Sequence, residues 1–79
     1  MFRMPAPTTF TYINPTISIN STNIRFSSKC DEQQTFILKS RILTVDRASN
    51  EILIFLTDNQ IVQLIDCPQE TYSLIVDSL

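Results

Sequence analysis

Residues able to do covalent or acid-base chemistry are scarce in this chain, which has two cysteines, eight acidic residues and no histidine. The absence of histidine removes the commonest general base, the usual catalytic triads and most zinc sites. Cys30 follows Lys29, and Cys67 precedes the Pro68 start of a candidate helix; both positions favour a lowered thiol pKa. Because no histidine is present to activate a thiol, we interpret Cys30 as a loop or half-buried thiol and Cys67 as a helix cap.

The carboxylates fall where turns or strand ends are expected. Short acidic side chains are common at such places because they bond to the nearby backbone. Calcium-loop spacing is absent, and the chain has no glycine, which excludes the glycine-rich phosphate loops of nucleotide sites. We therefore expect no catalytic residue, no metal and no cofactor, and hence a protein that is not an enzyme. The acidic residues concerned are Asp31, Glu32, Asp46, Asp58 and Asp66.

Lys39, Arg41 and Arg47 form the only group of basic residues, with the aromatic Phe26 and Phe36 nearby in the sequence. Basic and aromatic side chains on a sheet are typical of proteins that bind single-stranded nucleic acid. Charged side chains on an edge strand also prevent aggregation, however, and the chain as a whole has a net charge of −2. We therefore do not expect nucleic acid to be the main partner.

The length of 79 residues allows one small domain, which we place at residues 9–79 after a flexible arm at residues 1–8. The first ten residues lack the apolar core of a signal peptide, and no apolar stretch is long enough to cross a membrane. We expect a cytoplasmic protein without membrane contact. The eleven isoleucines and nine threonines favour strands.

Alternating apolar residues predict a first hairpin around a turn at residues 20–23 and a long strand at residues 35–45 with a bend at its polar centre. A second hairpin is predicted around Asp58-Asn59. Without glycine, asparagine and aspartate must take the left-handed turn positions. A helix is predicted at residues 68–79, capped by Cys67 or Asp66.

A two-residue turn at Asp58-Asn59 fixes which side chains of the second hairpin share a face. It places Leu53 and Phe55 with Val62 and Leu64 on one side of the sheet. The other side is also apolar and is interrupted only by Gln63. Strands with two apolar faces are typical of a sheet that is covered on both sides. The residues of the second face are Ile52, Ile54, Leu56, Ile61 and Ile65.

These patterns predict a mostly β (α+β) fold: a four- to five-stranded antiparallel sheet, or a small barrel, with one C-terminal helix packed on it. One helix covers only one face, so the other must be covered by the N-terminal hairpin or by a second copy of the chain. We favour a second copy because so small a domain gains stability by pairing. The self-association face would be formed by Ile52, Ile54, Leu56, Ile61 and Ile65.

The leading functional hypothesis is a small module for protein–protein interaction that forms a homodimer. A second hypothesis is a small acidic inhibitor, of the type encoded by phage or mobile elements, that masks a basic or nucleic-acid-binding surface of a host protein through Asp31, Glu32 and Asp58. A third is a single-strand nucleic-acid binder that uses Lys39, Arg41 and Arg47.

Overall fold

The computed structural model describes residues 6–28 and 33–79, which are mostly β-strand with one C-terminal helix, as predicted. Five of the eight residues assigned to the flexible arm lie outside the described residues, and Thr8 already belongs to the first strand. The elements are β1 (Thr8–Ile13), β2 (Thr16–Ile19), β3 (Asn23–Ser27), β4 (Gln34–Leu38), the 3-10 turn η1 (Lys39–Arg41), β5 (Ile42–Ala48), β6 (Glu51–Leu56), β7 (Gln60–Ile65) and α1 (Gln69–Asp77).

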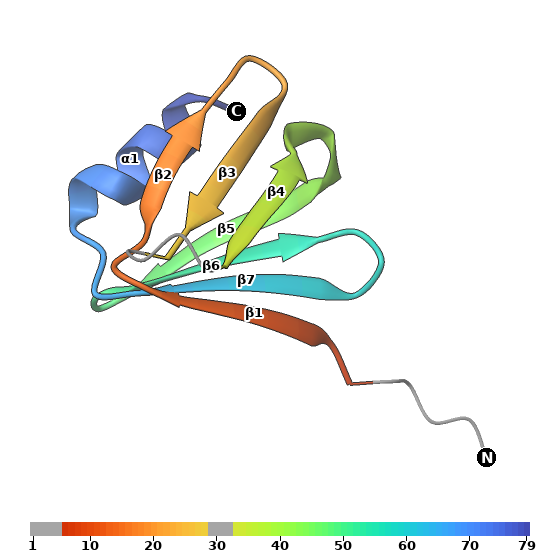
Figure 1. Cartoon of the computed structure of the whole chain (residues 1–79), viewed down its shortest axis with the longest axis horizontal. Coiled ribbons are helices and arrows are strands. Elements are labelled where there is room, and N and C mark those ends of the chain that lie inside the picture. Colours follow the sequence, from red (N-terminus) through yellow and green to blue (C-terminus); the bar gives the residue numbers. More distant parts are fainter. Residues whose placement is uncertain (1–5, 29–32) are drawn as a thin grey trace.

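The strands form two sheets (Figure 1). One has four strands in the order β1-β7-β6-β5, and the other has three in the order β2-β3-β4. All neighbours are antiparallel except β1 and β7, which run parallel. Parallel strands need a long connection. Here that connection is almost the whole domain, so no tight turn sets the relative direction of β1 and β7.

The core lies between the two sheets. The N-terminal hairpin, β2 with β3, forms part of the second layer, so the hairpin and not a second copy covers this face of the four-stranded sheet. The helix adds Ile75 to the same core. The hydroxyl of Tyr12 is hydrogen-bonded to that of Thr35 across the two sheets. The buried residues are Tyr12, Ile24, Phe26, Ile37, Ile52, Ile54, Leu56, Val62, Leu64, Cys67 and Ile75.

The long strand predicted at residues 35–45 is divided by η1, at the polar centre where a bend was expected. The two halves enter different sheets, so this bend carries the chain from one layer to the other. Backbone bonds hold it on both sides: Lys39 N–H donates to the Thr22 carbonyl at 2.9 Å, and the Arg41 carbonyl accepts from Thr57 N–H at 2.9 Å.

Asparagine and aspartate take most of the left-handed backbone positions, as the absence of glycine predicts. Among the described residues, positive φ occurs at Asn14, Ser49, Asp58, Asn59 and Asp66. Asn14 lies where the chain leaves β1 for the second sheet, and its N–H donates to the Ile65 carbonyl at 2.7 Å. Short polar side chains tolerate this conformation better than apolar ones.

The register of the second hairpin differs from the prediction by one residue. The loop has three residues, because Leu56 pairs with Gln60 and Ile54 pairs with Val62. The extra loop residue is Thr57, whose N–H is bonded to Arg41 instead of to the opposite strand. A shift of one residue moves every side chain of a strand to the other face.

This shift divides the predicted self-association face. Ile52, Ile54 and Leu56 point into the core with Val62 and Leu64. Ile61 and Ile65 lie on the opposite face of the sheet, so the five residues do not form one surface. The prediction that they share a face was wrong because β6 and β7 are apolar on both sides, so the pattern does not reveal the register, and the three-residue loop shifts it by one residue.

The helix is shorter than predicted and is capped differently. It begins after Pro68, which occupies the N-cap without a side-chain hydrogen bond, so neither Cys67 nor Asp66 caps it. Ile75 is buried, but Val76 is 38% exposed and Leu79 is 56% exposed. Of the apolar residues of the helix region at spacings of three and four, Tyr72, Ile75, Val76 and Leu79, only Tyr72 and Ile75 therefore contact the core.

The observed register can be checked with two matched substitutions. Ile54→Val should lower the free energy of unfolding by about 0.5–1.5 kcal/mol, because it removes a methylene group from a close-packed site. Ile61→Val should have a smaller effect, because Ile61 is only partly buried. Urea denaturation measures both. Equal losses for the two variants would contradict the register.

Candidate functional site

The face of the four-stranded sheet that points away from the core is left uncovered by the elements in residues 6–28 and 33–79. We call it the open face. Leu43 is 67% exposed and Ile13 is 64% exposed, while the other apolar side chains of this face are partly buried by their neighbours. An uncovered sheet face of this kind is a candidate interaction surface. Its apolar residues are Ile13, Leu43, Leu53, Phe55, Ile61 and Ile65.

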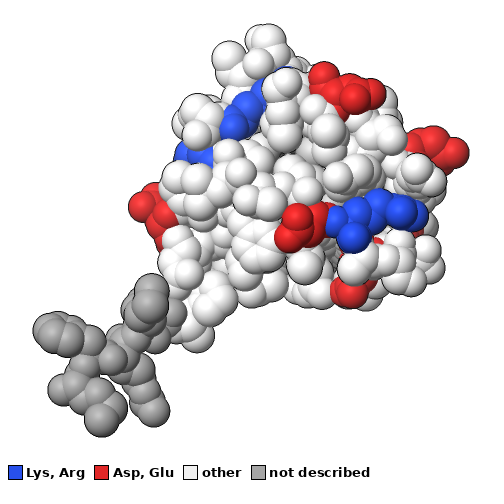
Figure 2. Space-filling view, turned by 180° about the vertical axis from the view of Figure 1, so that it is seen from behind, with Lys and Arg blue, Asp and Glu red and all other residues white. Residues whose placement is uncertain are grey.

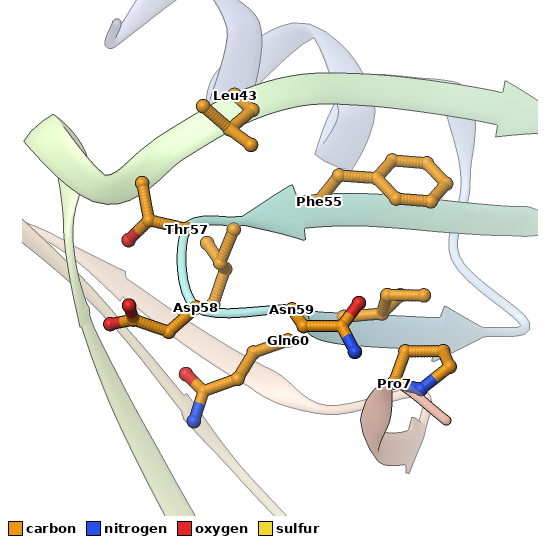
Figure 3. A pocket seen from close by; sticks show the side chains of 9 residues that line it. Pro7, Leu43, Phe55, Thr57, Asp58, Asn59 and Gln60 are labelled. Carbon is orange, nitrogen blue, oxygen red and sulfur yellow. The ribbon is translucent and has the colours of Figure 1, made fainter. Parts of the chain in front are cut away.

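One end of the open face is its most apolar part. Phe55 and Ile61 are directly paired across β6 and β7, and Leu43 lies beside Phe55 at a β-bulge in β5. We call Leu43, Phe55 and Ile61 the apolar row. The row lines a shallow hollow of about 500 Å³, bordered by Pro7 and by the β6–β7 loop (Figure 3). The hollow is open to solvent.

A polar ladder crosses the open face next to the apolar row. The Thr11 hydroxyl donates to Gln63 Oε1 at 3.3 Å, and Gln63 Nε2 donates to Glu51 Oε1 at 2.6 Å. These bonds satisfy the side-chain amide of Gln63, the polar residue that interrupts the apolar pattern of β7. They also separate the apolar row from Ile13 and Ile65, so the apolar surface is concentrated at the hairpin end.

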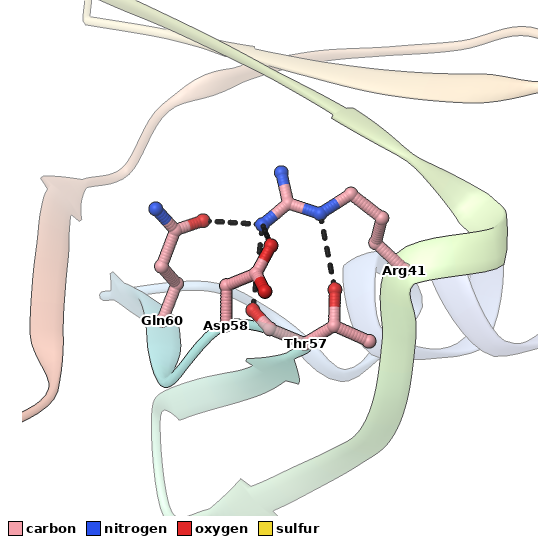
Figure 4. Close-up of polar contacts among 4 residues, drawn as sticks. All are labelled: Arg41, Thr57, Asp58 and Gln60. Atoms are coloured by element: carbon pink, nitrogen blue, oxygen red, sulfur yellow. Dashed lines mark hydrogen bonds and ion pairs between the residues drawn. The ribbon is translucent and has the colours of Figure 1, made fainter.

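Arg41 holds the hairpin loop at that end (Figure 4). Its Nε donates to Thr57 Oγ1 at 3.2 Å, and its Nη2 donates to the Thr57 carbonyl at 3.3 Å and to Gln60 Oε1 at 2.5 Å. The carboxylate of Asp58 lies 3.6 Å from the same nitrogen. Three donors engaged on one loop give Arg41 a structural role. The sequence suggested instead that Arg41 contacts a partner.

The other basic residues do not gather with Arg41. Lys39 Nζ donates to the Ser78 carbonyl at 2.8 Å, at the C-terminal end of α1 where a positive charge is favourable. Arg47 lies near the far end of β5. Figure 2, a view from behind, shows basic side chains in two separate places. Lys39 and Arg41 share the turn η1 but bond in different directions, and Arg47 lies apart from both, so the predicted basic group does not form one surface.

A different basic and aromatic pair lies on the outer side of the three-stranded sheet. Arg25 is directly opposite Phe36, which is 59% exposed, whereas Phe26 is in the core. One arginine and one aromatic ring make a much smaller surface than the grooves that track a nucleic-acid backbone.

Cys67 is buried beside the β5–β6 turn. Its N–H donates to the Asn50 carbonyl at 3.0 Å, and its Sγ lies 3.8 Å from the Ile65 carbonyl oxygen. Burial, and to a smaller extent the charge of Asp66, raises the pKa of the thiol above its ordinary value. From the position of Cys67 before the helix, the sequence predicted a lowered thiol pKa instead. Burial outweighs the helix dipole here, so the thiol is a packing group and a poor nucleophile.

The remaining predicted site residues give no chemical centre. Lys29, Cys30, Asp31 and Glu32 lie outside the described residues. Within the described ranges, no three cysteine or acidic side chains come together as a metal site would require. The same ranges contain no helix long and apolar enough to cross a membrane.

Comparison with known proteins gives no further identification. No protein-family model, curated protein or solved structure matches the chain. The open face must therefore be interpreted from its own geometry. Leu43 and Phe55 are the residues that sequence reasoning missed: no sequence signal marks the bulge at Leu43, and Phe55 had been placed on the face that carries Val62.

Substitution of Arg41 should test its structural role. Arg41→Lys keeps the charge but loses the planar fork, so we expect the free energy of unfolding to fall by about 1–2 kcal/mol. Arg47→Lys is the control, because Arg47 makes no hydrogen bond or ion pair with the described residues. Thermal unfolding followed by circular dichroism measures both. If the Arg41→Lys variant were as stable as the wild type, the positive charge alone would be enough to hold the β6–β7 loop.

Burial of Cys67 should make its thiol slow to react. In a Cys30→Ser background, alkylation by iodoacetamide at pH 8 should be at least several-fold slower in the native protein than in urea, because both burial and the raised pKa lower the reactive thiolate. Mass spectrometry follows the reaction. Equal rates in the two states would show that the thiol is accessible.

Proposed function

We propose that the chain is a non-enzymatic module for protein–protein interaction that binds through the open face. The observation that supports the proposal is the apolar row of Leu43, Phe55 and Ile61 on a sheet face that the described elements leave uncovered. Contiguous apolar surface beside polar residues is characteristic of protein interfaces. The bonded polar ladder gives this surface a fixed boundary.

The shape of the hollow favours a protein over a small molecule as the ligand. Small-molecule sites are concave and bury most of the surface of their ligand, with a few polar groups pointing inward. The hollow beside Phe55 is shallow, and the polar side chain of Gln60 on its rim is bonded to Arg41. A flat, apolar surface of this kind suits another protein surface.

The other hypotheses remain predictions with less support from the geometry. Asp58 is one of the three acidic residues assigned to an inhibitor. It is paired with Arg41 and is therefore not a free charge. Lys39 and Arg41 are engaged within the molecule, which leaves Arg47 alone of the proposed nucleic-acid contacts. A cytoplasmic location and the absence of enzymatic activity also remain predictions.

Two exposed leucines provide a matched test of the open face. Leu43 is 67% exposed in the apolar row, and Leu74 is 63% exposed on α1. An aspartate at either position faces solvent, so both variants should fold. Used as bait in affinity capture, the wild type and Leu74→Asp should retain the same binding proteins, this chain included, and Leu43→Asp should lose them.

Circular dichroism and urea denaturation verify that the two variants are equally folded. Identical capture by all three proteins would contradict the proposal, because it would place any binding outside the open face. Loss of capture with Leu74→Asp alone would contradict it as well and would assign the interaction to α1.

A further inference from the structure

We propose that the free edge of β4 binds an extended segment of a partner protein, which joins the three-stranded sheet as a fourth strand. β4 is an outer strand of that sheet (Figure 1), and no strand in residues 6–28 or 33–79 pairs with its other side. This edge belongs to the sheet that does not carry the open face. The inference therefore goes beyond the proposed function and does not depend on it.

The hydrogen bonds at the two ends of β4 show which of its backbone groups face the free edge. The Gln33 carbonyl accepts from Ser28 N–H at 2.9 Å, and Lys39 N–H donates to the Thr22 carbonyl at 2.9 Å. Residues of an antiparallel pair bond alternately, so the odd-numbered residues of β4 bond to β3. The even-numbered residues, whose N–H groups point toward the free edge, are Gln34, Phe36 and Leu38.

The side chains at these free positions are largely apolar. Phe36 is 59% exposed and Leu38 is 48% exposed, and both lie on the outer side of the sheet, away from the buried Ile37. β4 contains no charged residue, no proline and no bulge. Exposed edge strands usually carry such features because they prevent the edges of sheets from joining. An apolar edge without them is typical of a strand that pairs with an added strand.

The other three edges in the described part of the chain are less suitable. β5 is interrupted by a bulge and carries Asp46 and Arg47. β2 has only four residues. β1 has no charge, but its N–H groups bond to the β7 side at Thr8 and Asn14, which leaves mostly threonine at the free positions. The free positions of β1 are Thr9, Thr11 and Ile13.

Arg25 indicates which charge the partner segment carries. It lies directly opposite Phe36 on β3 and makes no hydrogen bond or ion pair with the described residues. A strand added beyond β4 would lie two strand spacings, about 10 Å, from β3. A glutamate opposite Phe36 can reach Arg25 across the ring from that distance. We therefore infer a segment with an acidic residue flanked by apolar residues at alternate positions.

The capped peptide Thr-Val-Thr-Glu-Thr-Val-Thr is a probe with this pattern. Its valines and glutamate share one face, and the sequence reads the same in both directions. The peptide should bind the full chain with a Kd below about 1 mM. It should also slow amide hydrogen exchange at Gln34, Phe36 and Leu38, which NMR measures residue by residue. Weaker binding, or slowed exchange at the free positions of β1 instead, would overturn the inference.

Two methylated peptides test whether backbone bonds hold the added strand. N-methyl groups on the valines and the glutamate remove the donors that would face β4, so binding should weaken by about tenfold or more. N-methyl groups on the threonines between them change only the opposite edge of the peptide and should leave the affinity nearly unchanged. Equal affinity of the two methylated peptides would contradict strand addition.

Two substitutions in the chain test the side-chain contacts. Phe36→Ser and Arg25→Gln should each weaken binding of the unmodified peptide by about two- to fivefold. Leu74→Ser and Arg47→Gln are the matched controls and should bind like the wild type, because Leu74 is 63% exposed on α1 and Arg47 lies on β5. Circular dichroism verifies that all four variants are folded. Unchanged binding by Phe36→Ser and Arg25→Gln would place the peptide elsewhere and overturn the inference.

A second copy of the chain is the competing occupant of this edge. Without peptide, amide exchange along β4 should not depend on protein concentration. Slower exchange there at high concentration, with a mass above 9.1 kDa in sedimentation equilibrium, would assign the edge to self-pairing and overturn the inference.

The Leu43→Asp variant separates this inference from the proposed function. Because Leu43 lies on the open face, this variant should bind the peptide like the wild type, whether or not it retains the proteins captured by the open face. Loss of peptide binding in Leu43→Asp would place the peptide on the open face and overturn the inference.

Discussion

The contact between Arg41 and the β6–β7 loop is the interaction on which the rest of the structure depends. The Arg41 carbonyl accepts the N–H of Thr57, and its guanidinium binds both oxygens of the same residue. Thr57 is thereby kept in the loop and out of the ladder. The loop then has three residues, and this number decides which side chains of β7 face the core.

The same contact links the two layers. Arg41 ends the 3-10 turn that carries the chain from the three-stranded sheet to the four-stranded sheet. At the start of that turn, Lys39 reaches the end of the helix. One polar turn, Lys39-Ser40-Arg41, therefore holds a hairpin loop and a helix terminus. This explains why the two basic side chains lie in a mainly apolar strand pattern.

Much of the local structure could be predicted from the sequence, because it follows from local chemistry. Both hairpins, the bend at residues 39–41, the terminal helix and the use of asparagine and aspartate in place of glycine are all confirmed. The assignment of faces in the second hairpin could not be predicted. Ile54 and Phe55 are equally apolar neighbours, so periodicity gives no preference, and the deciding bond comes from Arg41, outside the hairpin. The open face was missed for the same reason.

The parallel pairing of β1 with β7 has a consequence for how the chain acquires its fold during synthesis. Thr11 and Gln63 are bonded across 52 residues, so β1 is made first but has no neighbour in its sheet until β7 emerges. Long-range pairs of this kind form slowly, because the entropy of closing the loop opposes them. The N-terminal hairpin, β2 with β3, is local and can form early. The newly made chain must therefore keep β1 unpaired until β7 has left the ribosome.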